Sequence, residues 1–488
     1  MAGISGISSG IDIDTIVKTL VQAEQAPKTN QLDKLEKQTT TRISAIGTLT
    51  GALNTFKSAI DSLNKTSLFE SRTASVSNSS MVKATATSTA PAGSYNLQVQ
   101  QLASSSKVAL QAVSGGTKAT FGGGTLEISA GSSSISVEVT EANNTLAGIR
   151  DSINEAGKSS GISATIITDD SGSRLVLSST KTGQGNDVKV TVPTAPAGAV
   201  SGDNALSTLA FTAAADPDNA GAFLKPNSST GAGGVITQAK SAKLTIDGLQ
   251  LERDSNTIKD ALEGVTLDLL AAQSSGDLTD GKTISLTVGV DKGSVKSSLQ
   301  KFVDAYNTLI STTSQLTAYV PVDGSAPVTG PLFGDTSVRS LLSGLRNELV
   351  NSSSADGGIQ ALAELGITTG KDGKLSLNDS QLTAALDKNF DQVGAYLTGD
   401  NGLMGRLSSF TTTYVATDGV LKQRNDALQA TKLDVDKQRK TLNQRIESLQ
   451  TRLYSQYNAM DSLVGQLKRT SDSLGGMLAN LPGFVKKD

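Results

Sequence analysis

The residues of this chain best placed to do chemistry are three pairs of aspartates: Asp12 with Asp14, Asp169 with Asp170, and Asp216 with Asp218. Paired carboxylates could bind calcium or act as a general acid and base. No pair lies within the full ligand pattern of an EF-hand loop. The first pair falls at an expected helix start and the second in an expected turn, where aspartate caps and turns the backbone. We therefore interpret all three pairs as structural.

Other catalytic constellations are missing from the composition. Histidine and cysteine are both absent, which excludes Ser-His-Asp triads, thiol nucleophiles, zinc sites of the usual ligand types and disulfides. The glycines at 115, 116 and 122–124 could cradle a phosphate, but no GxxxxGK[ST] motif surrounds them. A carboxylate-based glycosidase is the one common chemistry left open. We predict that the protein is not an enzyme and uses no cofactor or metal.

Charge and hydropathy argue against two classes of partner, nucleic acids and membranes. The net charge of −3 comes without a basic cluster, which argues against nucleic-acid binding. The N-terminus lacks the basic start and apolar run of a secretory signal. No stretch reaches the roughly 18 apolar residues of a membrane helix. We therefore predict no membrane insertion and no cleaved signal peptide.

Helical spacing begins near the N-terminus. Ile13, Val17 and Val21 predict a short helix with Asp12 or Asp14 as its N-cap and Pro27 as its end. A second helix should run to about Lys65. Within it the apolar residues recur every three or four positions, as in a coiled coil: Ile46, Leu49, Leu53, Phe56, Ile60 and Leu63.

The C-terminal region repeats this pattern. One heptad register contains Leu442, Ile446, Leu449, Leu453, Gln456, Met460, Leu463, Leu467, Thr470 and Leu474. We expect this seam to pair with the Ile46–Leu63 seam, either in an ordinary intramolecular hairpin or with neighbouring subunits completing it. Gln456 and Thr470 interrupt the register, either as polar core positions that set the pairing or as solvent-facing residues.

Between the helical ends the periodicity changes to two. Tyr95, Leu97 and Val99 alternate with polar residues and predict half-buried strands. A unit from Gly124 to Val192 should contain two strands, a helix and two further strands. The fold class is therefore α+β multidomain: a helical coiled-coil stem formed by the N- and C-terminal segments, with two inserted mainly-β domains. The stretch 193–235, rich in Ala, Gly, Ser and Asn, is expected to be poorly ordered surface.

The expected domains follow this order. They are residues 1–70, an N-terminal helical stem; 71–115 with 236–293, an inner β-domain; 116–235, an outer β-domain; 294–405, a helical leg domain; and 406–488, a C-terminal coiled-coil stem.

Several motifs resemble the bacterial flagellar filament cap family, also called flagellar hook-associated protein 2. They are GISSGIDIDTIVKTLVQAEQAP (6–27), GSYNLQVQQLA (93–103), FVDAYNTL (302–309), GPLFGDTSVRSLL (330–342), LGITTGKDGKLSLND (365–379) and YSQYNAMDSLVGQL (454–467). The resemblance covers nearly the whole chain in order. The unit 124–192 also resembles a repeat found in flagellins.

The resemblance implies a ring of copies, most often five, at the extracellular tip of the flagellum. The ring would retain exported flagellin and promote its folding and insertion. Hook-filament junction proteins, a cytosolic export chaperone at the C-terminal helix and host mucin are the further partners implied. Export would use the flagellar type III system. A surface adhesin that binds mucin or glycans through its β-domains is the alternative function.

Overall fold

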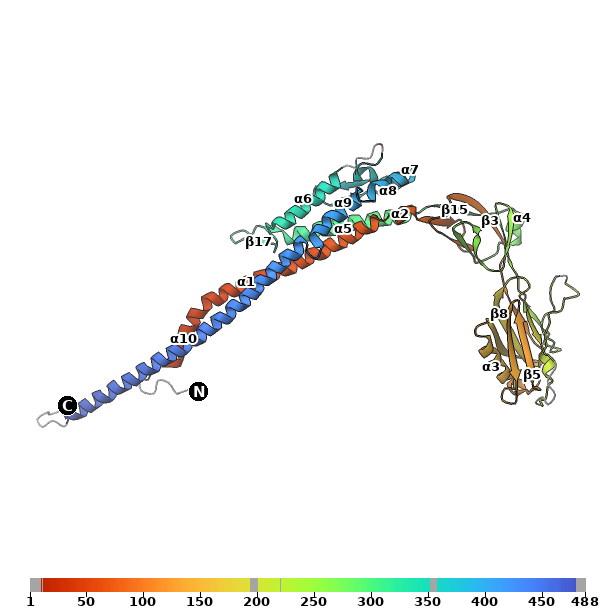
Figure 1. Cartoon of the computed structure of the whole chain (residues 1–488), viewed down its shortest axis with the longest axis horizontal. Coiled ribbons are helices and arrows are strands. Elements are labelled where there is room, and N and C mark those ends of the chain that lie inside the picture. The colour runs from red at the N-terminus through yellow and green to blue at the C-terminus, as the bar shows by residue number, and fades with distance from the viewer. Residues whose placement is uncertain (1–9, 11, 194–200, 220, 352–357, 480–488) are drawn as a thin grey trace. The chain divides into compact units, whose positions relative to one another are not determined.

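The computed structural model describes residues 10, 12–193, 201–219, 221–351 and 358–479. These residues form two compact units. The helical unit contains the described residues up to 69 and from 292 onward, and the β unit contains 70–291. The two ends of the chain therefore fold together and the β region is inserted between them, as the sequence predicts (Figure 1).

The helical unit has two long helices and several shorter ones. Its helices are α1 Ile13–Leu63, α2 Thr66–Glu70, α5 Lys292–Leu316, α6 Thr336–Val350, α7 Asp379–Lys388, α8 Phe390–Leu397, α9 Leu403–Val415 and α10 Val420–Ala479. A 3-10 turn spans Leu362–Leu365. Two short hairpins pair β16 Tyr319–Val320 with β17 Val328–Thr329, and β18 Ile367–Thr369 with β19 Leu375–Leu377.

The sequence predicted that the first helix ends at Pro27. Helix α1 instead continues through this proline. A proline inside a helix removes one backbone hydrogen bond and crowds the preceding turn. Tertiary packing outweighs this cost, because Val21 and Leu32 on either side of the proline are buried. The start was predicted correctly: Asp12 is the N-cap and accepts a 3.0 Å hydrogen bond from the Thr15 amide.

The described residues of the β unit form four sheets around two hydrophobic cores. Its strands are β1 Arg72–Val76, β2 Val82–Ala86, β3 Gly93–Gln101, β4 Ser105–Ala109, β5 Gly124–Ala130, β6 Ser133–Val139, β7 Ile162–Asp169, β8 Gly172–Thr182, β9 Val188–Thr191, β10 Gly234–Thr237, β11 Ala242–Ile246, β12 Leu249–Arg253, β13 Thr257–Leu262, β14 Val265–Leu269 and β15 Ile284–Val290. Its helices are α3 Leu146–Gly157 and α4 Ser275–Thr279, with 3-10 turns at Gly116–Lys118 and Leu206–Leu209.

The first β core lies between the sheets β1-β15-β3-β11-β12 and β13-β14-β2. The second β core lies among the sheets β10-β4-β8-β7 and β6-β5-β9 and helix α3. Val108, Leu110 and Val113 belong to the second core, so the chain enters it before residue 116, where the outer domain was expected to begin. Strand β4, which carries Val108, pairs with β8 of the second core and accounts for this difference.

The described part of the stretch 193–235 is mostly exposed, as its composition suggested, but it also contributes residues to the second β core. Leu206 and Leu209 are buried in the second β core. Phe211 exchanges two backbone hydrogen bonds, of 2.8 and 2.9 Å, with Val190 of β9. The composition did not reveal these core residues, because sparse apolar residues without periodicity can still fill a core that other segments build. Residues 194–200 and 220 lie outside the described residues.

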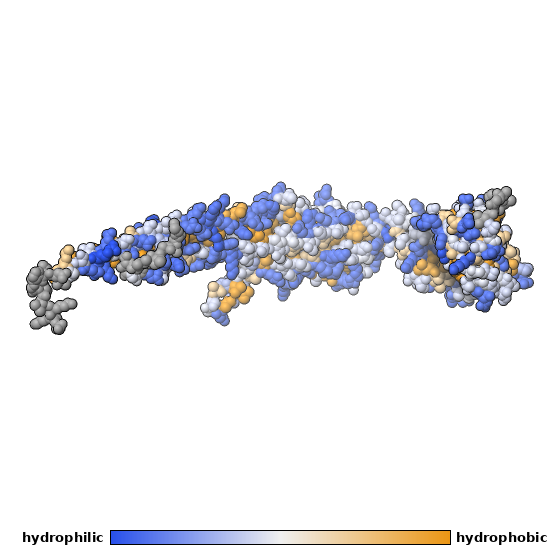
Figure 2. Space-filling model, turned by 90° about the horizontal axis from the view of Figure 1, so that it is seen from below, coloured by the Kyte–Doolittle hydropathy of each residue, from blue (hydrophilic) through white to orange (hydrophobic). Residues whose placement is uncertain are grey.

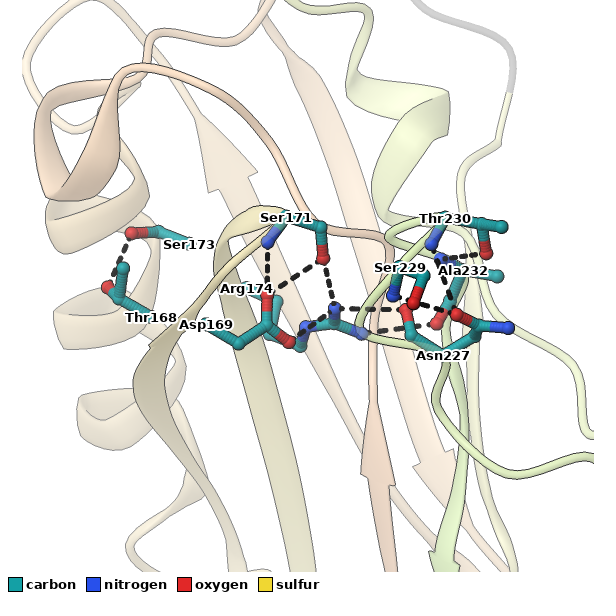
Figure 3. Close-up of polar contacts among 9 residues, drawn as sticks. All are labelled: Thr168, Asp169, Ser171, Ser173, Arg174, Asn227, Ser229, Thr230 and Ala232. Atoms are coloured by element: carbon teal, nitrogen blue, oxygen red, sulfur yellow. Dashed lines mark hydrogen bonds and ion pairs between the residues drawn. The ribbon is translucent and has the colours of Figure 1, made fainter.

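Arg174 of β8 holds the later part of this stretch against the sheet (Figure 3). Its guanidinium forms a 2.6 Å ion pair with Asp169 and donates hydrogen bonds to the backbone oxygens of Ala232 (3.1 Å) and Asn227 (3.4 Å). Asn227 in turn accepts hydrogen bonds from the amides of Ser229 and Thr230. A single arginine, 3% exposed, therefore fastens a loop more than fifty residues away in sequence.

Candidate assembly interface

Helices α1 and α10 form an antiparallel pair (Figure 1). Ion pairs fix their alignment: Arg439 contacts both Asp33, at 2.7 Å, and Glu36, while Arg445 lies 3.2 Å from Glu24. As the residue number rises along α10, the number of its partner on α1 falls. The helices therefore run in opposite directions, and the beginning of α1 faces the middle of α10.

We call the pair of helices α1 and α10 the stem. An apolar core lies between the two helices. Ile13, Val17 and Val21 of α1 are buried together with Ile446 of α10. Partly buried residues of α10 complete the cluster: Leu442, Leu449, Leu453, Tyr454 and Tyr457. Four of the predicted seam residues of α10, Leu442, Ile446, Leu449 and Leu453, thus lie together in the stem.

The expected partner of that seam was wrong. The residues Ile46, Leu49, Leu53, Phe56, Ile60 and Leu63 are buried, but they lie in the body of the helical unit. There Phe56 contacts Phe302 and Tyr306 of α5, with ring centroids 5.4 and 5.6 Å apart, and the neighbouring Lys57 donates to Ser408 of α9. The antiparallel arrangement explains the difference, because it places the end of α1 near the start of α10 and not near its seam. Only the first part of the seam, Leu442 to Leu453, faces Ile13–Val21 instead.

The last turns of α10 have a different environment. Met460, Leu463, Leu467 and Leu474, all predicted seam residues, are 39%, 58%, 61% and 52% exposed. Met477 and Leu478, which were not among the predicted seam residues, are 68% and 50% exposed. We call these six residues the tail stripe. No described residue of α1 aligns with it, since the stem core already reaches the beginning of α1 at Tyr454 and Tyr457.

Comparisons with known proteins identify the family. The family profiles "Flagellar hook-associated protein 2 N-terminus" and "Flagellar hook-associated protein 2 C-terminus" match residues 9–106 and 239–469. The B-type flagellar hook-associated protein 2 of Pseudomonas aeruginosa is 44% identical over 100% of both chains. The chain belongs to the flagellar hook-associated protein 2 family.

Further relatives agree with this assignment. The flagellar hook-associated protein 2 of Escherichia coli K12 is 34% identical over 98% of this chain and 99% of its own length. The crystal structure of the D1-D2-D3 domains of the flagellar cap protein FliD from Escherichia coli is 33% identical, with a TM-score of 0.56, and covers 79% of this chain and 99% of that one. A profile named "Flagellin hook IN motif" matches residues 125–181, within the unit that resembled a flagellin repeat.

Two polar residues interrupt the seam of this hook-associated protein 2 family member. Gln456 and Thr470 are both exposed. The Thr470 hydroxyl donates a 2.9 Å hydrogen bond to the Gln466 carbonyl of its own helix. In the single chain both residues therefore face solvent, and neither forms a polar contact inside the stem core.

The first two aspartate pairs lie at the helix start and the turn expected for them, and the third lies in the stretch that was expected to be poorly ordered. Hydrogen bonds from Thr15 hold the pKa of the Asp12 carboxyl below its ordinary value. Asp169 lies in the turn between β7 and β8 and accepts from Ser171 and Arg174, while the Asp218 amide donates to Asp216. Within the described ranges, no group of three or more acidic residues could hold a metal ion. None of the helices in those ranges is long and apolar enough to cross a membrane.

Proposed function

We propose that this chain caps the distal end of the bacterial flagellar filament, outside the cell, as a ring of identical copies. Such a ring would retain exported flagellin and promote its folding and insertion beneath the cap. The observation that carries this proposal is the tail stripe: a row of large apolar side chains on a regular helix, extending beyond the stem that covers the rest of the seam.

The tail stripe supports assembly because exposed apolar surface is costly in water. Each square ångström removed from water contributes about 25 cal/mol, so a partner helix that covers the stripe gains binding energy without nucleotide hydrolysis. Neighbouring copies, flagellin and hook-filament junction proteins are the proposed partners in the assembled filament. Before type III export, a cytosolic chaperone would cover the same surface.

Deleting the gene in a flagellated host tests the capping function. We expect loss of swimming and release of monomeric flagellin into the medium, measured by motility plates and by blotting the culture supernatant. Normal swimming without leaked flagellin would rule out capping by this chain.

A tail variant tests the proposed role of the stripe. Restoring the deletion strain with the double variant Leu463→Ser and Leu467→Ser should leave flagellin leakage high, because a polar stripe gains little from being covered. Asp472→Asn, another exposed residue of the same tail, is the matched control and should restore swimming. Full restoration by the serine variant would show that the stripe is not the assembly surface.

Two predictions concern adhesion: that the cap also binds host mucin, and, as the alternative function, that the chain is a surface adhesin. Binding of the purified full chain to a mucin-coated surface, compared with an albumin-coated one, would test both. Equal retention on the two surfaces would contradict adhesion.

A further inference from the structure

The hairpin formed by β16 and β17 is an exposed apolar arm. It follows the C-terminal end of α5, and its base is fixed by backbone hydrogen bonds from Gly330 to Ala318 (2.8 Å) and from Leu332 to Leu316 (2.9 Å). Figure 1 shows it beyond the end of α5, and in Figure 2 it is a projection from the side of the helical unit with hydrophobic surface. Residues 320–329 are all exposed.

The composition of the arm is unusual for an exposed loop. Residues 317–334 carry one charged side chain, Asp323 at the tip. Tyr319, Val320, Val328 and Phe333 are 55%, 52%, 62% and 51% exposed, and the rings of Tyr319 and Phe333 stack with centroids 5.4 Å apart. Contiguous exposed apolar surface of this kind marks an interaction site.

The arm is built for contact through side chains and not for strand addition. Pro321 and Pro327 flank its tip and lack the amide hydrogen that a new neighbouring strand would need. A two-stranded hairpin is also marginally stable alone in water, so an arm of this kind gains order when its apolar side is covered. The expected partner surface is therefore a groove that accepts valine and tyrosine side chains.

Such a groove lies between α1 and α5 of the same unit. It has a volume of about 490 Å³ and is lined mainly by small side chains: Thr55, Ser58, Ala59, Ser62, Ser298, Ala305 and Thr308. Among the described residues that line it, Lys301 is the one cation, and Asp304 accepts a 2.8 Å hydrogen bond from Gln300. Lys301 forms no ion pair with any described residue, so its charge is available to an incoming carboxylate.

The arm cannot fill the groove of its own chain. The groove lies at residues 298–308 of α5, while the base of the arm is fixed after residue 316. At about 1.5 Å per residue these sites are on the order of 12 Å or more apart along the helix, and the arm extends away from them. A second copy of the chain can supply the arm.

We propose that the β16–β17 arm of one copy docks into the α1–α5 groove of the next, with Val320 and Val328 inserted and Asp323 facing Lys301. The contact joins two different surfaces, so it repeats from copy to copy and closes a ring when the rotation allows. This inference rests on the ring of the proposed function and names one of its contacts. The carboxylate of the arm, Asp323, is opposite in charge to Lys301 of the groove, and this match is the reason for choosing another copy as the occupant.

Charge reversal tests the pairing in the full chain. Asp323→Lys and Lys301→Asp should each weaken self-association about tenfold in sedimentation velocity, whereas the double variant should return to within about twofold of the original. Lys371→Asp, an exposed lysine in the β18–β19 turn, is the control and should change nothing. Single variants with unchanged association, or a double variant without rescue, would overturn the proposed contact.

Cross-linking tests the geometry, since the chain has no cysteine of its own. Mixing the full-length variants Val328→Cys and Ser58→Cys under oxidising conditions should give a covalent dimer of the two chains. Val328→Cys with Ser473→Cys should not. Absence of the first dimer while electron microscopy still shows rings would refute this contact but leave the capping function intact. A photo-crosslinker at position 328 that captures only flagellin would also refute it.

Discussion

The tail of α10 and the stretch 201–235 differ in whether their apolar side chains are covered. The tail stripe consists of leucines and methionines, yet each is at least 39% exposed. The stretch 201–235 is rich in small and polar residues, yet Leu209 is fully buried and the loop near Asn227 is fastened by Arg174. The difference lies in what surrounds each stretch.

The comparison teaches that burial is decided by what lies opposite a segment. The tail has an apolar stripe but extends past the start of α1, so the single chain offers it no partner among the described residues. The stretch 201–235 has few apolar residues, but strands β4, β5, β8 and β9 already form a core with room for them. We infer that the tail stripe is covered only when another molecule binds it, whereas the apolar residues of 201–235 are covered by the second β core of the same chain.

The largest expected effect is at Leu209. Leu209→Ala should lower the free energy of unfolding by about 2–5 kcal/mol, because it leaves a cavity in a core that cannot fully close around it. Chemical denaturation of the full chain, followed by circular dichroism and by hydrogen exchange in the β unit, measures this loss. A change below about 0.5 kcal/mol would show that 201–235 is not part of that core.

Removing the Arg174 guanidinium should have the next largest effect. Arg174→Met keeps much of the buried side-chain volume but loses the ion pair and the bonds to Asn227 and Ala232, at a cost of about 2–3 kcal/mol. Hydrogen exchange at Ser229 and Thr230 should accelerate. Arg253→Met, which removes the more exposed pair with Asp260, is the control and should cost less. Equal losses in the two variants would contradict the fastening role of Arg174.

Acid should weaken the same fastening. Hydrogen bonds from Ser171, with Arg174 beside it, hold the pKa of Asp169 below its ordinary value. Because the folded pKa is the lower one, ionised Asp169 stabilises the fold above the unfolded value of about pH 4, and this stabilisation is lost as the pH falls through the folded pKa. Asp169→Asn should destabilise the protein at pH 7, and the difference from the original chain should shrink below pH 4. Asp170→Asn is the control, and a difference independent of pH would exclude this linkage.

The sequence predicted local features well because they depend on nearby residues. The alternation that predicts β3 and the helical spacing of Leu146, Ile149 and Ile153 each follow from the backbone period. The structure buries the three helix residues and, in β3, Leu97 and Val99, with Tyr95 partly buried. The partner of the α10 seam could not be predicted, because spacing shows that a helix has an apolar face but not what covers it. Likewise, nothing near residue 227 in sequence shows that Arg174 will hold it.

The smallest expected effect on the stability of the single chain is at the tail. Its contrast with the effect at Leu209 is the sharpest test of the difference between the two regions. Leu463→Ala should change the free energy of unfolding of the monomer by less than about 0.5 kcal/mol, because the side chain is already 58% exposed. Leu209→Ala makes the same chemical change at a buried site, which makes it a matched comparison. In the assembled filament Leu463→Ala should instead weaken retention of the cap, measured as flagellin leaked by a deletion strain that carries the variant. A monomer destabilised as strongly as by Leu209→Ala would mean that the tail is covered within its own chain.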